Sequence, residues 1–598
     1  MSPRKNLVLL GALALLVLVY YVFDVKEGEE RRRAAQEASR VLRQVSRAEI
    51  VRVSWKGAKE PYELMRSDGR WELSRPLRAR ADSQTVEGIL RAVAGLQEGR
   101  LIGKKVEDLK TFGLEKPAFT LEVGLQGGKV RTLLLGDENP TKSYRYAKLA
   151  DSGRVFLVDA DFKDKLDREL YRLRDKTILP LKADKVQRLV VHKGGKVIEA
   201  VKRGKEKWDL VQPVRYAADS FEVETAIGAV ADGRVKRFVE EAPKDLARYG
   251  LAEPAYRVQF FPKDAKRALE LLIGKAEVRE VEERGKKEKR TFYFAKRLDR
   301  PNVFQVNEEL FKDLPQSAFQ IRDKKVYDYD VDEVARLEIE TPRETVEIRR
   351  RGKKSWEIVK PFQARGDHQH IDDVLWDIKW AKATGFVDDP EADLSRYGLQ
   401  SPAAQVRVVL KGEKKPLEFA LGPLKDKRAY GRRAGEKVLF SLGQADYKKI
   451  VKTAFYLKYR RLYGLERDAI ARVAIEWPKE KLSLERREFE WFLRGKKGKA
   501  DTLKVNDLVD ALRELEYEKE VKPAPGAPYD FSKPRIKVIL YGKGDKTYPT
   551  FTLASGGTDK FLFGQMSHRP GAVLLLDRKN LERSLPKDAA ALLPTETS

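Results

Sequence analysis

The sequence predicts an α+β protein: a single N-terminal transmembrane helix and a helical stalk, then four tandem α+β repeat domains with antiparallel sheets. Three observations predict this class. An uncharged run lies near the N-terminus, a set of markers recurs at fixed spacing, and each set contains an apolar stripe of helical period. The chain of 598 residues is too long for one hydrophobic core, so several domains are expected.

The first predicted element is a membrane anchor, residues 1–25. The run LVLLGALALLVLVYYVF, residues 7–23, carries no charge and lies at the short end of the length that spans a bilayer. Arg4 and Lys5 precede it, and its aromatic end suits a membrane interface. We expect an uncleaved, single-pass anchor in the bacterial inner membrane, with most of the chain extracytoplasmic, in the periplasm. Cleavage as a signal peptide is the alternative.

The second predicted element is a helical stalk, residues 26–48, which is rich in Ala, Glu and Arg. Oppositely charged side chains four residues apart stabilise a solvated helix, and this composition provides them. A coiled-coil dimerisation stalk is the alternative, although the segment lacks sustained heptads.

The rest of the chain repeats one pattern. A tryptophan is followed five residues later by a proline, an aspartate comes six residues after that proline, and a Gly-Leu-x-x-Pro element ends 46 residues after the tryptophan. A strand that ends in an apolar residue and glycine follows, and then further strands and a closing helix are expected. The markers are Trp71, Pro76, Asp82, Gly113 and Pro117 in the first copy, Trp208, Pro213, Asp219, Gly250 and Pro254 in the second, and Trp356, Pro361, Asp367, Gly398 and Pro402 in the third.

These markers predict four repeat units, residues 49–176, 184–325, 332–462 and 468–593. The fourth unit is divergent. It keeps Trp491 and Asp501, but Asp530 takes the place of the glycine in Gly-Leu-x-x-Pro. The later glycine is matched with Gly564, and the prolines around residue 526 exclude a helix end, so we expect an extended loop there.

Each repeated aspartate precedes a stripe of apolar residues. After Asp82, apolar residues fall four, seven, eight and eleven positions later, as on one face of a helix. Asp219, Asp367 and Asp501 are followed by the same stripe. An aspartate in this place accepts hydrogen bonds from first-turn N–H groups, so we interpret these residues as helix caps rather than catalytic carboxylates.

The repeated Gly-Leu-x-x-Pro element is typical of a helix end. A glycine such as Gly250 adopts the left-handed conformation without the steric cost of a Cβ. Leu246 and Leu251 then make the hydrophobic contact of a Schellman motif, and Pro254 stops the helix from resuming.

No catalytic or cofactor motif is recognisable. His368 and His370, with Asp372 and Asp373 nearby, resemble a metal cluster, but residues two apart on a helix do not share a face. No phosphate-binding loop, nucleophile elbow or zinc-protease motif occurs. We therefore expect no enzymatic activity, no cofactor and no metal.

The charge balance favours anionic partners. The formal net charge is +28, and the absence of cysteine excludes disulfides, thiolate metal sites and cysteine nucleophiles. The tryptophans and tyrosines near Lys and Arg fall at repeat positions typical of a core, so we do not expect nucleic acid to be a partner.

The tandem W-x4-P and Y-G-L-x-x-P units, with a capped helix between them, resemble a bacterial repeat family of unknown function. Members of that family resemble accessory proteins of gliding-motility-type ABC transporters. The resemblance covers nearly the whole chain after the stalk. It implies an ABC-type permease or ATPase system as the partner and brings no catalytic residues.

We therefore expect a non-enzymatic, membrane-anchored repeat protein of the bacterial envelope that acts as an auxiliary or scaffold component of an ABC-type transport system. The alternative, which the charge suggests, is a binding module for an anionic envelope polymer or lipid surface. A hydrolase built from Asp82, Asp219 and Asp367 is a third class.

Overall fold

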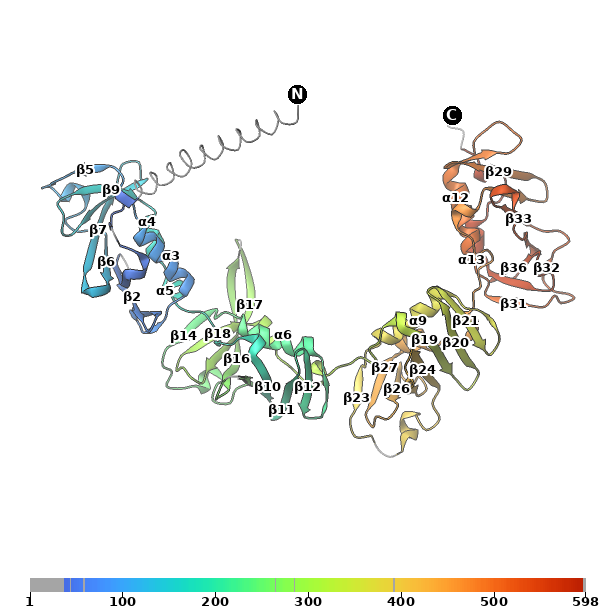
Figure 1. Cartoon of the computed structure of the whole chain (residues 1–598), viewed down its shortest axis with the longest axis horizontal. Coiled ribbons are helices and arrows are strands. Elements are labelled where there is room, and N and C mark those ends of the chain that lie inside the picture. The colour runs from blue at the N-terminus through green and yellow to red at the C-terminus, as the bar shows by residue number, and fades with distance from the viewer. Residues whose placement is uncertain are drawn as a thin grey trace, which may run out of the picture. The chain divides into compact units, whose positions relative to one another are not determined.

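The computed structural model describes residues 37–594, apart from residues 44, 58, 59, 264, 284, 391 and 392. This part of the chain divides into two compact units, one ending at Asp323 and the other starting at Lys324. Each unit contains two copies of one sheet-and-helix fold, which we number repeats 1 to 4 in chain order (Figure 1).

Repeat 1 is a nine-stranded antiparallel sheet of order β4-β3-β2-β1-β6-β7-β8-β9-β5. Its strands are β1 (Ile50–Lys56), β2 (Tyr62–Ser67), β3 (Arg70–Arg75), β4 (Ala79–Arg80), β5 (Leu101–Gly103), β6 (Phe119–Leu125), β7 (Val130–Glu138), β8 (Tyr144–Leu149) and β9 (Val155–Asp159), and its helices are α3 (Ser83–Ala94), α4 (Phe162–Leu166) and α5 (Leu170–Leu173).

Repeat 2 has the same sheet order, β13-β12-β11-β10-β15-β16-β17-β18-β14. Strands β16 and β17 continue past the sheet as a long hairpin (Figure 1). The elements are β10 (Val186–Lys193), β11 (Lys196–Arg203), β12 (Lys207–Gln212), β13 (Tyr216–Ala218), α6 (Ser220–Ala231), β14 (Arg237–Glu240), β15 (Tyr256–Pro262), β16 (Leu269–Glu283), β17 (Lys286–Arg297), β18 (Val303–Asn307), α7 (Glu308–Asp313) and α8 (Ala318–Ile321).

Repeat 3 again orders its nine strands β22-β21-β20-β19-β24-β25-β26-β27-β23. The elements are β19 (Val334–Glu340), β20 (Thr345–Gly352), β21 (Ser355–Lys360), β22 (Ala364–Arg365), α9 (His368–Trp380), β23 (Gly385–Val387), β24 (Ala404–Leu410), β25 (Leu417–Leu421), β26 (Arg428–Arg433), β27 (Leu439–Gly443), α10 (Gln444–Ile450) and α11 (Ala454–Leu457).

Repeat 4 has a sheet of eight strands, β30-β29-β28-β33-β34-β36-β37-β31, and a separate ladder of β32 with β35. The elements are β28 (Arg472–Glu476), β29 (Lys481–Arg487), β30 (Glu490–Leu493), α12 (Thr502–Glu514), β31 (Lys519–Val521), β32 (Tyr529–Asp530), β33 (Ile536–Tyr541), β34 (Phe551–Leu553), β35 (Ser555–Gly556), β36 (Phe561–Met566), β37 (Val573–Asp577) and α13 (Arg578–Ser584). In the segment expected to be an extended loop, residues 525–526 form a turn and only Tyr529–Asp530 are extended, pairing with β35 as β32.

One face of each sheet packs against the long helix of its repeat and forms the core. In repeat 1 the residues that α3 buries include Val86, Ile89, Leu90 and Val93, the apolar stripe after Asp82. Because side chains alternate across a strand, every second residue of the central strands joins this core and the others lie on the opposite face.

The predicted helical stalk is wrong for the part that the structure describes. Residues 37–43 and 45–48 do not form a continuous helix, because Val41, Leu42 and Val45 are buried in the core of repeat 1. Arg40 pairs with Gln97, just after α3. Burying an aliphatic side chain stabilises a fold by about 1.5–3 kcal/mol, which a solvated stalk forgoes.

The predicted transmembrane helix and inner-membrane localisation also need correction. Among the described residues, no helix is long and apolar enough to cross a membrane. The long helices α9 and α12 carry a polar face and pack on sheets, and antiparallel sheets dominate the described chain. The anchor assigned to residues 1–25 and the beginning of the stalk lie outside the described residues.

The segments predicted to link the repeats belong to the cores of the repeats that follow them. Ile178 and Leu179 are buried in the core of repeat 2, Val326 in that of repeat 3 and Tyr463 in that of repeat 4. Each segment pairs with a residue two or three positions past the end of the long helix, as Thr177 does with Arg234. Arg40 makes the same pairing before repeat 1, and we call these four segments lead-ins. The pairing residues Arg40, Thr177, Lys325 and Arg461 lie seven to nine residues before the starts that the markers predict.

Candidate functional site

Each repeated aspartate caps the long helix of its repeat and joins that helix to the closing segment. The Asp82 carboxylate accepts a hydrogen bond of 2.8 Å from the Thr85 N–H, and the Asp82 N–H donates to the Leu173 carbonyl at 2.8 Å. Asp219, Asp367 and Asp501 make the corresponding contacts in their own repeats. These carboxylates are engaged by the backbone, which suits a structural role.

The electrostatics of Asp82 keep it charged. Burial alone would raise the pKa of Asp82, but the N–H and hydroxyl of Thr85 and the Lys176 ammonium, 3.6 Å away, lower it below its ordinary value. A carboxyl group with a lowered pKa is a weak base near neutral pH, so Asp82 is unsuited to general-base catalysis.

The repeated tryptophan packs under the long helix and reaches a polar group on it. The indole N–H groups of Trp208, Trp356 and Trp491 donate to Glu224, Asp372 and Asn506 at 3.3, 3.1 and 3.0 Å, respectively. These three rings are almost fully buried, whereas Trp71 is partly buried. Each acceptor lies five residues after the capping aspartate, a spacing that the sequence showed and that our sequence analysis missed.

The repeated glycine ends a single turn of 3-10 helix. Gly250 has φ of 67°, and the Leu251 N–H donates to the Leu246 carbonyl at 3.0 Å, as in a Schellman motif. Gly113 and Gly398 have φ of 66° and 68° and are followed by the same bond. The prolines Pro117, Pro254 and Pro402 each lie two residues before the next strand, β6, β15 and β24.

A second glycine packs directly against this helix end. A Cβ on Gly274 would lie 2.1 Å from the Tyr249 carbonyl oxygen, and the equivalent distances at Gly136 and Gly422 are 2.0 and 2.4 Å. Our match of Gly564 to this position is wrong. The strand register makes Ala554 the counterpart, because Ile536 pairs with Leu553 as Tyr256 pairs with Ile273.

The two histidines of the suspected metal cluster face different carboxylates. His368 Nδ1 lies 3.1 Å from an Asp372 oxygen, and His370 Nδ1 lies 3.9 Å from Asp367. The two histidine rings therefore do not face one common metal position, as expected for residues two apart on a helix.

The structure does bring a third residue from repeat 4 to His370. Among the described residues, Asp367, His370 and Glu516 hold ligand atoms within 4.8 Å of one another and could accept a metal ion. Glu516 also pairs with Arg460 at 3.0 Å and Arg461 at 3.7 Å. Two guanidinium groups this close oppose a divalent cation, so the group acts as an ionic cluster at the junction of repeats 3 and 4.

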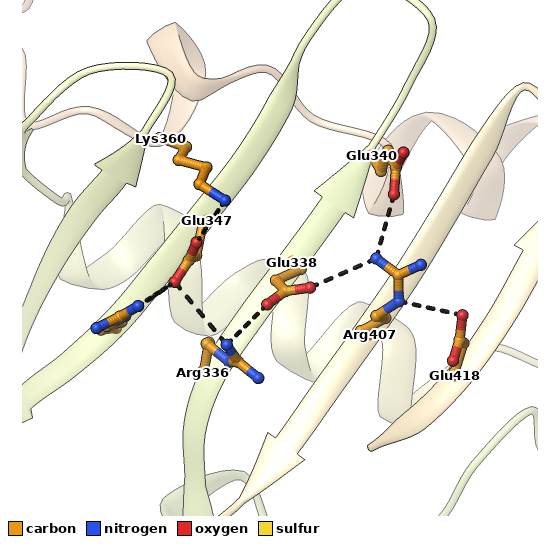
Figure 2. Close-up of polar contacts among 8 residues, drawn as sticks. Arg336, Glu338, Glu340, Glu347, Lys360, Arg407 and Glu418 are labelled. Carbon is orange, nitrogen blue, oxygen red and sulfur yellow. Dashed lines mark hydrogen bonds and ion pairs between the residues drawn. The ribbon is translucent and has the colours of Figure 1, made fainter. Parts of the chain in front are cut away.

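The face of the repeat 3 sheet opposite α9 carries a connected set of ion pairs, which we call the repeat 3 ladder (Figure 2). Its members are Arg336, Glu338, Glu340, Glu347, Arg349, Lys360, Arg407 and Glu418. Arg407 lies 3.1 Å from both Glu340 and Glu418 and 3.5 Å from Glu338. The ladder contains four positively charged and four negatively charged side chains, so its net charge is zero.

Glu347 is the buried member of the ladder, with 5% of its side chain exposed. Burial alone would raise the pKa of Glu347, but Arg349 at 2.7 Å and Lys360 at 3.3 Å lower it below the ordinary value. Arg336 also lies 3.9 Å from Glu347, and repeats 1 and 2 keep this arginine–glutamate pair as Arg52–Glu63 at 2.9 Å and Arg188–Glu199 at 2.7 Å. An arginine 19 or 20 residues before each repeat tryptophan was the sequence signal for this pair.

Repeats within one unit meet through the residues that close the earlier repeat. Arg174 of repeat 1 contacts both carboxylate oxygens of Glu241 in repeat 2, at 2.5 and 2.9 Å. Its guanidinium carbon lies 3.5 Å from the centroid of the Phe238 ring. A bidentate arginine–carboxylate pair fixes orientation as well as distance, so this contact holds the two repeats in register.

Comparison with known proteins identifies the family of the chain. The family described as "Domain of unknown function (DUF4340)" matches residues 71–209, 208–392 and 356–534. The chain matches no curated protein. Two solved structures of a DNA polymerase sliding clamp from Pseudomonas aeruginosa, one with a ligand, align at 8% and 9% identity. They cover 67% and 66% of this chain and 93% and 92% of the clamp chains, but TM-scores of 0.10 carry no conclusion about fold.

Proposed function

We propose that this protein, whose chain belongs to the DUF4340 family, is a non-enzymatic scaffold and an auxiliary component of an ABC-type transport system. The family is a domain of unknown function, and it recurs here in tandem. The observation that carries the scaffold role is that the repeated marker residues stabilise the local backbone and the core of each repeat. Asp219 caps a helix, Gly250 ends one, and Trp208 packs beneath the first.

The junctions support a scaffold as well. Each lead-in completes the core of the following repeat, and Arg174 joins repeats 1 and 2 through Glu241 and Phe238. Repeats connected in this way present surfaces at defined spacing, which is how repeat proteins bind large partners. The assignment to an ABC-type system rests on the resemblance of the W-x4-P and Y-G-L-x-x-P units alone.

Crosslinking in the native cell followed by affinity purification of the tagged full chain tests the partnership. We expect ATPase and permease subunits of one transport system to be recovered together. Recovery of the intact chain without either subunit contradicts the proposed partner.

A junction variant tests the scaffold role. Arg174→Ala removes the bidentate pair with Glu241 that joins repeats 1 and 2, although the Tyr171 hydroxyl still donates to the Val235 carbonyl. It should therefore lower recovery of the partner while each repeat keeps its own protection from hydrogen exchange. Arg131→Ala is the matched control, because it removes an exposed ion pair with Asp151 within repeat 1. Equal recovery with both variants would contradict a role for the repeat register.

The net charge of +28 supports a second candidate, binding of an anionic polymer or lipid surface. Binding of this kind should weaken steeply as salt rises, because the Debye length falls from about 30 Å at 0.01 M to about 8 Å at 0.15 M. Co-sedimentation with anionic vesicles or polyphosphate across this range measures it, and binding that does not change with salt counts against it.

A further inference from the structure

We propose that repeat 4 contains a binding pocket for a single-chain amphiphile with an anionic head group, of the fatty-acid class. The pocket has a volume of about 800 Å³ and lies between the sheet and the closing segment of the repeat. Ile536, Leu553, Leu562 and Leu581 form its apolar floor, and Trp477 stands at its wall. Small-molecule sites in proteins span about 300–1,000 Å³, so the pocket is of ligand size.

Repeat 2 shows why this space is open in repeat 4. In repeat 2 it is filled by three aromatic rings: Phe311 stacks on Tyr293 with centroids 3.9 Å apart, and its edge meets Tyr256 at 5.0 Å.

The equivalent residues of repeat 4 are aliphatic. Tyr256 and Tyr293 correspond to Ile536 and Leu562, because each pair occupies the same register on its strands. Phe311 corresponds to Leu581, since each comes four residues after the residue that caps the closing helix. Three rings are thus replaced by three smaller side chains, and the strands around them are kept.

The wall of the pocket has also changed. Lys193 of repeat 2 lies at the end of β10, donates to the Gln316 side chain at 2.9 Å and sits over the Tyr256 ring. Repeat 4 has Trp477 at this position, and its indole N–H donates to the Pro586 carbonyl at 3.1 Å. The charged Lys193 side chain that covers this space in repeat 2 is therefore replaced in repeat 4 by the largely apolar ring of Trp477.

The mouth of the pocket is basic. Glu480 and Asp588 at the rim each accept a backbone N–H, and Glu582 pairs with Arg535 at 3.1 Å. The remaining charged residues of the lining are Lys479, Lys579, Arg583 and Lys587. In the part of the chain that the structure describes, these four form no ion pair, so they can attract an anionic group to the mouth of an apolar pocket.

This combination selects the ligand class. Each methylene of an alkyl chain favours binding when it moves from water into an apolar site, and a carboxylate at the mouth meets the lysines. A cationic amphiphile with the same chain would meet like charges.

Isothermal titration of the full chain with dodecanoate, below its micelle concentration, is the direct test. We expect saturable binding of one dodecanoate, and binding at least about tenfold weaker for dodecylammonium, which has the same chain and the opposite charge. Equal affinity for the two would overturn the proposal, as would the absence of dodecanoate binding.

Two variants locate the site. The double substitution Leu562→Tyr and Leu581→Phe restores two of the three rings that repeat 2 carries, the stacked pair, and should abolish binding. The double substitution Lys579→Glu and Lys587→Glu changes only the mouth, and should weaken dodecanoate binding by about tenfold or more. Lys496→Glu with Lys497→Glu makes the same charge change on an exposed turn outside the pocket and should leave affinity unchanged.

Trp477 provides a local signal. The chain has eight tryptophans, so a fluorescence change on dodecanoate binding that disappears in Trp477→Phe assigns the ligand to this pocket. Dodecanoate binding that keeps its affinity in the folded ring-filled variant, or in the mouth variant, would place the ligand elsewhere and refute the proposal.

Discussion

Repeats 2 and 4 share a scaffold but fill it differently. Both keep a buried tryptophan whose indole N–H reaches the long helix, and both cap that helix with an aspartate whose N–H meets the closing segment. Repeat 2 then ends a 3-10 turn with Gly250, whereas repeat 4 has the β32–β35 ladder in this place.

The difference teaches which markers the fold depends on. The aspartate joins the long helix to the closing segment in all four repeats, and the tryptophan joins the sheet to that helix in repeats 2, 3 and 4, so both persist even in the divergent repeat 4. The glycine fixes only a turn outside the main core. Its loss in repeat 4 comes with the change of the second glycine to Ala554, because no carbonyl of a 3-10 turn approaches that position any longer.

The largest effect is expected where the two repeats agree. Trp208→Ala and Trp491→Ala should each destabilise their own repeat by about 3–5 kcal/mol, since each removes a fully buried aromatic side chain and leaves a cavity. Hydrogen exchange of the full chain, resolved by repeat, measures both. A small effect in repeat 4 alone would mean that its tryptophan is not the shared core element.

The second test separates the repeats at the second glycine. Gly274→Ala should destabilise repeat 2 by about 2–3 kcal/mol, because the new Cβ would lie 2.1 Å from the Tyr249 carbonyl oxygen and the backbone must shift. Ala554→Gly in repeat 4 should cost no more than about 1 kcal/mol. Similar protection losses in the two repeats would disprove the link between this glycine and the 3-10 turn.

A third test concerns the helix-ending glycine. Gly250→Val should cost about 2 kcal/mol, since its φ is 67° and a Cβ would lie 2.9 Å from the Lys275 nitrogen. Gly285→Val is the control, because Gly285 has φ of 76° but nothing within 4 Å of a Cβ. An unchanged melting profile for Gly250→Val would refute the assignment of a helix end.

Much of the scaffold could be predicted from sequence, because its signals are local. The spacing of Asp82 from its apolar stripe predicts a capped helix, and Gly113 with Leu114 predicts the turn that is present. The prediction of a stalk was wrong because composition alone cannot show that Val41 and Leu42 pack into the core of repeat 1. The pocket also escaped prediction, because it depends on three residues from separate strands and a helix, Ile536, Leu562 and Leu581.

The fourth test returns to a feature that all repeats share. Asp219→Ala and Asp501→Ala should each cost about 1 kcal/mol in their own repeats, the usual effect of removing a helix cap. The triple substitution of Asp82, Asp219 and Asp367 by Asn should lower stability only modestly and leave partner recovery intact. A full loss of a chemical activity with folding preserved would instead favour the hydrolase interpretation.

The smallest expected effect is on the stability of repeats 1 and 4 at acid pH. Hydrogen bonds from Thr85 and Lys176 to Asp82, and from the Lys504 N–H to Asp501, hold the pKa of each carboxyl below its ordinary value. A group whose pKa is lower in the folded state stabilises the fold above its unfolded pKa of about 3.9, and this contribution is lost as pH falls through the folded value. Asp82→Asn and Asp501→Asn should therefore make the acid limb of unfolding shallower in repeats 1 and 4, respectively. Because both caps contribute in the same direction, an effect confined to repeat 1 would show that the divergent repeat holds its helix by packing rather than by its cap.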